Sequence, residues 1–160
     1  MIKKFNQLFE NNNYNIKQLE KIYKKFHDKN CIVGLSYLME TTNINPNFDV
    51  GDGTTLTYID EYFDNVDDKE DLIELIKILI KKGADINALD INGLPPIILS
   101  KNYDISRLFL DADCDLNIIV NEEGEDVLEY DNKLKEIVKK EYPEKYQVYL
   151  RNKQMNKFNI

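Results

Sequence analysis

The sequence predicts an all-α protein that folds as a short helical solenoid, with hairpin loops between its repeats and helical caps at both ends. Two observations lead to this prediction. First, residues 32–45, 74–87 and 104–117 share a pattern of two adjacent apolar residues, a short polar gap, and then Asn or Asp, Ile or Leu, and Asn. Second, a glycine follows each copy (Gly53, Gly93 and Gly124), and an apolar-rich segment follows each glycine. Recurrence at such intervals is typical of proteins built from stacked helical units.

The middle copy shows how one unit ends and the next begins. Seven apolar residues between Leu72 and Ile80 cover well over half of a helix circumference, which predicts a helix packed on more than one side. Gly83 follows two lysines, at a position where a helix C-terminus favours both a left-handed residue and positive charge. Pro95 and Pro96 fall in the first turn of the next helix, where a missing N–H costs nothing. The residues between these signals are enough only for a hairpin-like turn.

This joint resembles the joint between ankyrin repeats. In that family the end of a repeat reads Gly-Ala-Asp-hydrophobic-Asn, and residues 83–87 match it completely. Residues 90–97 then follow the family's Asp-x-x-Gly-x-Thr-Pro-Leu-His pattern, with Pro95 in place of the threonine. The copies ending at Asn45 and Asn117 are degenerate and keep mainly the last three positions. The resemblance implies stacked repeats whose inner helices and hairpin tips bind other proteins.

The spacing divides residues 1–160 into parts of one domain, a usual size for a single core. The three glycines lie 40 and 31 residues apart, whereas an ankyrin repeat has a period of about 33 residues. The longer interval holds an acidic insertion (residues 64–71), and the shorter one implies trimmed helices. The predicted parts are N-terminal helices with a capping half-repeat (1–45), a repeat with the acidic insertion (46–87), a short repeat (88–117) and C-terminal capping helices (118–160).

Further helices are expected at both ends, where they would cap the stack with polar outer faces. Residues 2–10 place four apolar side chains on one face, and Asn13 or Asn15 can cap a second helix that runs through Phe26 with Ile16 in its apolar stripe. Towards the C-terminus, helices are expected over residues 134–142 and 146–153, with a break at Pro143 between them.

Composition limits the possible partners. The chain has 29 acidic and 21 basic residues, a net charge of −8 and a pI near 4.7. We expect neither a nucleic-acid nor a membrane partner, because phosphates would be repelled, whereas a basic protein would be attracted.

The N-terminus does not read as a signal peptide, and no run approaches the roughly 18 apolar residues of a membrane span. Cys31 and Cys114 are expected as small buried or half-buried hydrophobes of a cytoplasmic protein, which we expect to be monomeric when free.

The residue types that carry enzyme chemistry do not form a recognisable pattern. His27 is the one histidine of the chain and is expected on the surface. The serines do not stand in a nucleophile-elbow context, and there is no zinc pattern, P-loop or dinucleotide fingerprint. We therefore expect a protein without catalytic activity, cofactor or metal.

Residues 111–122 have the acidic spacing of a calcium-binding loop, with acids at loop positions 1, 3, 5 and 12. Leu116 stands where such a loop needs glycine, and Ile119 occupies its ninth position. The ankyrin resemblance already explains Asp115 and Asn117 as the end of a repeat. These departures favour the repeat interpretation over a metal site.

Acidic and aromatic residues near the loops are the candidate partner-binding residues. The acidic insertion is either a solvated loop or a negative patch that meets a basic partner, where such charge sets association rate and specificity. Tyr58 and Tyr62 precede it as possible interface anchors. The full candidate set is Tyr58, Glu61, Tyr62, Asp64, Asp67, Asp68, Glu70, Asp71, Leu89, Asp90, Asn92, Asp111, Asp113, Glu122 and Glu123.

Together these features predict a non-catalytic protein-binding module. A small acidic domain without an attached effector domain suits a cytosolic inhibitor, such as the immunity protein that neutralises a basic toxin by 1:1 binding. The alternative is an ankyrin adaptor, or a host-directed interaction protein of a large virus or an intracellular bacterium.

Overall fold

The computed structural model describes residues 14–51, 53–59, 62 and 69–157. This part of the chain is all-helical, which confirms the predicted class, and its one recorded β-bridge is an isolated antiparallel pair between Ile119 and Asp126. Among the helices described, none is long and apolar enough to cross a membrane. In chain order they are α2 (Ile16–His27), α3 (Ile32–Thr41), the 3-10 helix η1 (Thr55–Tyr58), α5 (Lys69–Lys81), α6 (Pro96–Leu99), α7 (Tyr103–Asp111), α8 (Val127–Tyr130), α9 (Asn132–Glu141) and α10 (Pro143–Lys157).

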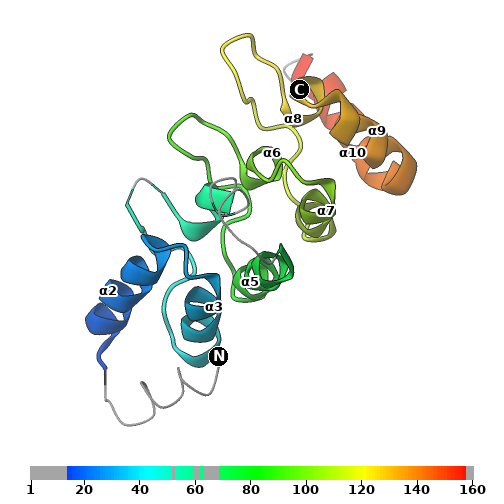
Figure 1. Ribbon diagram of the computed structural model, residues 1–160. Helices are drawn as coiled ribbons and strands as arrows, with labels where there is room; N and C mark the ends of the chain where they lie inside the picture. Colours follow the sequence, from blue (N-terminus) through cyan, green and yellow to red (C-terminus); the bar gives the residue numbers. More distant parts are fainter. Residues whose placement is uncertain (1–13, 52, 60–61, 63–68, 158–160) are drawn as a thin grey trace.

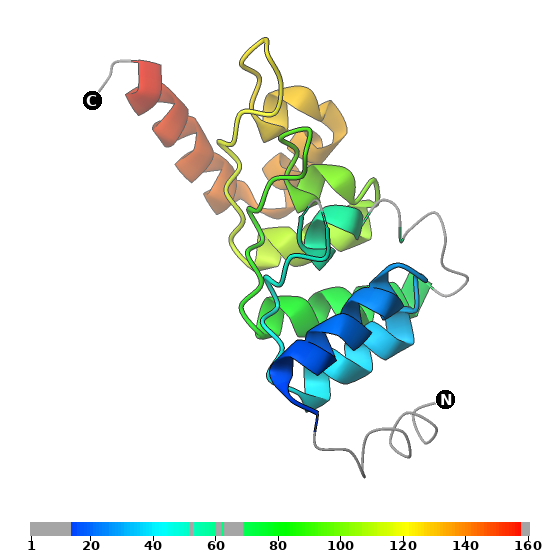
Figure 2. The same ribbon diagram turned by 90° about the vertical axis from the view of Figure 1, so that its left-hand side faces the viewer.

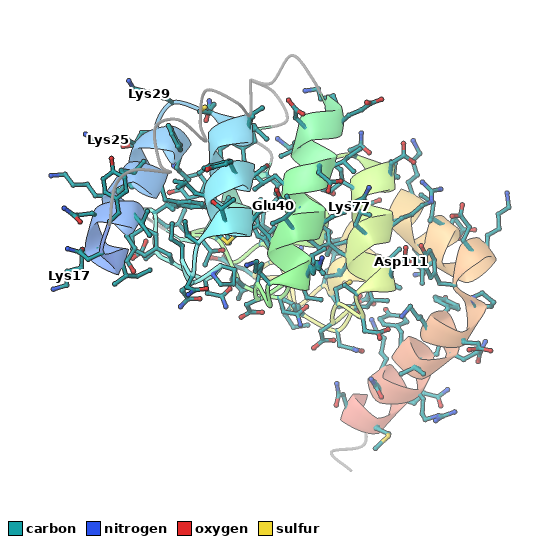
Figure 3. The ribbon with its side chains drawn as sticks, turned by 90° about the horizontal axis from the view of Figure 1, so that it is seen from below. Lys17, Lys25, Lys29, Glu40, Lys77 and Asp111 are labelled. Atoms are coloured by element: carbon teal, nitrogen blue, oxygen red, sulfur yellow. The ribbon has the colours of Figure 1, made fainter. Side chains whose placement is uncertain are left out.

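The helices form two layers. Figure 1 shows α2, η1, α6 and α8 along one layer and α3, α5, α7 and α9 along the other, and Figure 3 shows this second layer as a row of helices. Contacts link α2 to α3, α3 to α5, η1 to α6, α6 to α7, and α8 to α9. The last helix, α10, packs on α9 and turns away from the row.

The start of α2 agrees with its sequence signals. Asn15 accepts a hydrogen bond from the Gln18 N–H at 3.1 Å, and the Gln18 side chain accepts one from the Asn15 N–H at 2.9 Å. This capping box satisfies two N–H groups that would otherwise lack partners at the helix start. The predicted apolar stripe is wrong at its first position, because Ile16 is 44% exposed. The helix predicted over residues 2–10 lies outside the described residues.

The centre of the core is α5. Its buried residues are Leu72, Leu75, Ile76, Ile78 and Leu79, and they pack against α3. Acidic side chains stand in its first turn and Lys81 in its last turn, which matches the helix dipole. Gly83 follows in the left-handed conformation, with φ of 86°, as predicted for a helix end.

Residues 88–117, predicted as a short repeat, contain the short helices that the length of this segment implied. Pro95 is the N-cap of α6 and Pro96 its first residue, and the helix has four residues. Inside the turn to α7, the hydroxyls of Ser100 and Ser106 lie 2.9 Å apart, and both side chains are buried. The pair satisfies polar groups that burial would otherwise leave without partners.

The C-terminal helices differ from the prediction in their bounds. Helix α9 begins at Asn132, two residues earlier than expected, because Asp131 caps it by accepting from the N–H groups of Lys133 and Leu134. Pro143 does separate the two helices, but it is the first residue of α10 and not part of a longer break. Proline is well suited to that position, since its missing N–H is not needed in the first helical turn.

Candidate functional site

A ladder of asparagine side chains joins the turns of successive units. Asn47 accepts a hydrogen bond from the Asp85 N–H at 2.6 Å and donates to the carbonyl of Gly83 at 3.2 Å. One unit further on, Asn87 accepts from the Asp115 N–H at 2.8 Å. Each of these asparagines also donates its own N–H to the side chain of the residue two positions before it. The ladder holds neighbouring turns at a fixed spacing.

This ladder corrects the register of the sequence alignment in the first unit. Residue Asn45 was aligned with Asn87 and Asn117, but Asn47 makes the equivalent contacts. Asn45 corresponds instead to Asp85 and supplies the side-chain acceptor of the turn. The two-residue slip arose because Asn43 to Asn45 has the isoleucine that the pattern requires, whereas Asn45 to Asn47, which makes the contacts, has Pro46 in its place.

The hairpin between α5 and α6 is a rigid turn centred on Asp90. Its carboxylate accepts from the N–H groups of Asn92 at 2.9 Å and Leu94 at 2.7 Å. The Asp90 N–H donates to the Leu94 carbonyl at 3.0 Å, and Gly93 takes the positive φ of 80° that the turn requires. Asp90, a candidate binding residue, therefore shapes the loop. Leu89 and Asn92 are exposed and available for contact.

The hairpin between α7 and α8 is held in a similar way. The Val120 N–H donates to the Glu125 carbonyl at 2.8 Å, and the Asn121 side chain accepts from the Glu125 N–H at 2.9 Å. Glu122 and Glu123 are exposed at its tip, as their candidate role requires. Figures 1 and 2 show this hairpin and the preceding one projecting in the same direction.

Two exposed apolar side chains on these hairpins were missing from the candidate set. Ile91 is 79% exposed and Ile119 is 55% exposed, beside Leu89 at 49%. The sequence did contain a signal for Ile91, because an apolar residue between Asp90 and Asn92 in a turn must lie on the surface. We call the surface made by Leu89, Asp90, Ile91, Asn92, Ile119, Glu122 and Glu123 the hairpin face.

The aromatic candidates are largely in the core. Tyr62 is 1% exposed, so its prediction as a binding anchor is wrong, and Tyr58 is half-buried. His27, expected on the surface, is only 8% exposed. Its ring meets the rings of Tyr58 at 4.6 Å and Tyr62 at 5.5 Å between centroids, both edge to face. Aromatic packing of this kind explains why these residues are buried.

Two acidic candidates of the insertion, Glu70 and Asp71, belong to the described residues. Glu61, Asp64, Asp67 and Asp68 lie outside the described residues. Glu70 and Asp71 are exposed in the first turn of α5. The 13 residues of α5 separate them from the turn at its other end by about 18 Å at 1.5 Å per residue. The structure therefore does not bring these two candidates together with the hairpin tips.

The acidic residues of the calcium-like spacing are engaged with the C-terminal helices. Asp111 accepts a hydrogen bond from the Tyr142 hydroxyl at 3.0 Å, and Asp113 pairs with Lys145. Asp115 accepts from the Asn117 N–H at 2.9 Å within its own turn. Within the described ranges, no three Asp, Glu, His or Cys side chains gather in a way that could hold a metal ion. Asp111 and Asp113 therefore help to attach the C-terminal helices α9 and α10.

A buried carboxylate fixes α10 to the second hairpin. Asp126 is 4% exposed and caps α8 by accepting from the N–H groups of Leu128 and Glu129. The Tyr149 hydroxyl donates to it at 2.9 Å and Lys153 at 2.8 Å. Burial alone would raise the pKa of Asp126, but the hydrogen bonds from Lys153, Tyr149 and Glu129 lower it below its ordinary value. The carboxylate is therefore ionised at neutral pH.

Comparisons with known proteins do not assign the chain to a family. Family models give no match to this sequence, and no curated protein matches it. The function has to be inferred from the residues of the chain itself.

Proposed function

We propose that this chain is a non-catalytic protein-binding module, a short ankyrin-like solenoid that binds a basic protein through the hairpin face. Within that class we favour a small cytoplasmic inhibitor of the immunity type, which is monomeric when free and neutralises a basic toxin by 1:1 binding. The observation that carries the proposal is the rigid presentation of Ile91, 79% exposed, on a hydrogen-bonded turn.

Rigid apolar side chains favour binding because little conformational entropy is lost when a partner covers them. Ile91, Leu89 and Ile119 are held on two loops whose backbones are fixed by internal hydrogen bonds. An exposed isoleucine on a mobile loop would gain less on binding. The three side chains therefore suit the apolar centre of an interface, with polar residues around them.

The charge around the hairpin face favours a basic partner. Residues 83–100 include two acidic residues and no lysine or arginine, and residues 108–132 include nine acidic residues and no lysine or arginine. The exposed lysines Lys17 and Lys25 of α2, and Lys29 in the turn after it, lie at the α2 end of the helix row in Figure 3. Local negative charge of this kind accelerates association with a basic protein and weakens with added salt.

The decisive experiment pairs the chain with the protein encoded by the neighbouring gene. We expect co-expression to give a 1:1 complex by size-exclusion chromatography with light scattering, and to restore growth of cells that express that neighbour. Ile91→Arg should weaken the complex by at least tenfold, because it places a charge in the apolar centre of the interface. Ile16→Arg is the matched control, since Ile16 is also exposed but lies on α2.

Three results would separate the possibilities. A salt-sensitive complex that only Ile91→Arg weakens supports the proposal. A complex with an unrelated protein and no growth rescue points to the adaptor alternative. Equal effects of Ile91→Arg and Ile16→Arg would overturn the assignment of the hairpin face.

A further inference from the structure

A groove of about 400 Å³ lies between the third turn of the ladder and α10. Residues 113–117 form one wall, and Lys145, Val148 and Asn152 of α10 contribute to the other. Asp115, Asn117 and Asn152 continue into an adjoining hollow at the end of α10. The groove is separate from the tips of the hairpins, because none of the tip residues lines it.

The groove lies at Asn117, the asparagine that follows Asn47 and Asn87 in the ladder. Asn47 and Asn87 each accept a backbone N–H from the following unit, at 2.6 and 2.8 Å. Asn117 is the third residue of the series and has the same turn around it, with its N–H donated to Asp115. Its side-chain nitrogen also donates to Asp115, at 3.0 Å. Among the described residues, no N–H donates to its side-chain oxygen.

We propose that this groove binds an extended segment of a partner protein. A backbone N–H of that segment would donate a hydrogen bond to the side-chain oxygen of Asn117, as the Asp85 and Asp115 N–H groups do to Asn47 and Asn87. The segment would carry an apolar side chain with lysine or arginine beside it. The proposal concerns a second surface and stands whether or not the hairpin face binds a partner.

The lining of the groove fits such a segment. Val148 is 51% exposed and offers apolar surface from α10. Burial raises the pKa of the Cys114 thiol to about 12, so the thiol is neutral and adds to the apolar lining. Asp115 and Glu144 are exposed beside it and attract a basic side chain. Lys145 is paired with Asp113, so it opposes a positive segment less than an unpaired lysine would.

The position of α10 explains why the groove is open. The helix is attached beside the third unit through Lys145 to Asp113 at one point and through Tyr149 and Lys153 to Asp126 at another. Over its described residues α10 is one continuous helix, Pro143–Lys157, with no turn equivalent to residues 83–87 or 113–117. A partner segment can therefore take the place of the missing turn.

A peptide copied from the chain itself provides a defined probe. The probe is residues 79–88, Leu-Ile-Lys-Lys-Gly-Ala-Asp-Ile-Asn-Ala. It includes the N–H of Asp85 that bonds to Asn47, and two lysines that can meet Asp115 and Glu144 beside the groove. We would titrate this peptide into the ¹⁵N-labelled full chain and follow amide signals by NMR. We expect saturable shifts at residues 113–117, at 145–152 and at the side-chain amide of Asn117. A scrambled peptide of the same composition should give none.

Two variants test the mode of binding. Asn117→Ala removes the acceptor and should weaken binding about five- to tenfold, the usual effect of one hydrogen bond. Asn92→Ala is its control, being an exposed asparagine outside the groove. Val148→Arg should abolish binding by placing charge in the groove, whereas Ile119→Arg, at a residue of similar exposure on the hairpin face, should not.

The expected pattern is loss with the two groove variants and retention with both controls. Three other outcomes would overturn the proposal: no saturable shift at any soluble peptide concentration, shifts confined to residues outside the groove, or binding that Asn117→Ala leaves unchanged. Failure of the hairpin face would appear instead as a partner complex that Ile91→Arg weakens no more than Ile16→Arg does, whatever the result with this peptide.

Discussion

Helices α5 and α10 are held in the molecule by different interactions. α5 buries five aliphatic residues and packs against α3. α10 has no clear apolar face, with Val148 and Met155 exposed at 51% and 46%, and its deepest side chain is Tyr149. Beside the packing of Tyr146, Tyr149 and Leu150 on the core, α10 is held by polar contacts of Tyr149 and Lys153 with the buried carboxylate of Asp126.

This difference suggests separate roles for the two sets of contacts, one in the stability of the fold and the other in the position of α10. Apolar burial in α5 is not directional and depends little on pH, and it belongs to the largest favourable contribution to folding, the burial of apolar surface. Hydrogen bonds to a buried carboxylate add less net free energy, but they need one geometry. We therefore expect α5 to determine whether the chain folds, and the Asp126 cluster to determine where α10 lies and hence the shape of the groove.

The largest expected effect follows from removing apolar volume in α5. Leu79→Ala should lower the free energy of unfolding by about 3 to 4 kcal/mol, because Leu79 is 1% exposed and its neighbours cannot fill the cavity. Urea denaturation followed by circular dichroism would measure the change. Lys77→Ala, on the exposed side of the same helix, should change stability by less than about 0.5 kcal/mol. Similar losses in both variants would contradict the assignment of α5 to the core.

An intermediate effect is expected at Asp126. Asp126→Ala removes the cap of α8 and the partner of Tyr149 and Lys153, and should cost about 2 to 3 kcal/mol. Asp126→Asn keeps a capping oxygen and should cost less. Hydrogen exchange should show faster exchange in α10 than in α5 for both variants. Uniform exchange across the two helices would mean that α10 is not held by this cluster.

The same carboxylate predicts a pH dependence. Since the folded pKa of Asp126 is lowered, its ionised form stabilises the fold above the unfolded pKa of about 3.9, and this contribution is lost as the pH falls through the folded pKa. The melting temperatures of the wild type and Asp126→Asn should therefore differ at pH 7 and converge below about pH 4. A difference that stays constant over this range would show that the charge of Asp126 does not matter.

The smallest effect is expected in the ladder, which belongs to neither helix. Asn87→Ala removes the hydrogen bond to the Asp115 N–H and should cost about 1 kcal/mol. Chemical denaturation would measure it against Asn92→Ala at the hairpin tip, which we expect to be within about 0.5 kcal/mol of the wild type. If both substitutions cost the same, the ladder would have no special part in joining the units.

The sequence was most informative where local physical chemistry decides the structure. The cap at Asn15, the left-handed Gly83 and the helix start at Pro96 follow from the backbone needs of single turns, and all three are present. The apolar content of α5 likewise predicted its burial. Such features depend on residues close together in the chain, so one sequence is enough to find them.

Features that depend on residues far apart in the chain were harder to predict. The burial of His27 results from packing against Tyr58 and Tyr62, more than thirty residues away, and nothing in its own neighbourhood indicated this. The same packing removed Tyr62 from the binding surface. The roles of Asp111 and Asp113 were missed for a similar reason, because Tyr142 and Lys145 come from helices whose position the sequence did not fix.

The asparagine ladder also has a consequence for how this chain can change in length. Asn47 and Asn87 are 40 residues apart and Asn87 and Asn117 are 30 apart, yet each neighbouring pair of turns is joined by the same kind of bond. The first interval is therefore ten residues longer than the second. Two intervals of unequal length are thus joined by the same kind of hydrogen bond, so the spacing of these turns does not depend on how many residues lie between them.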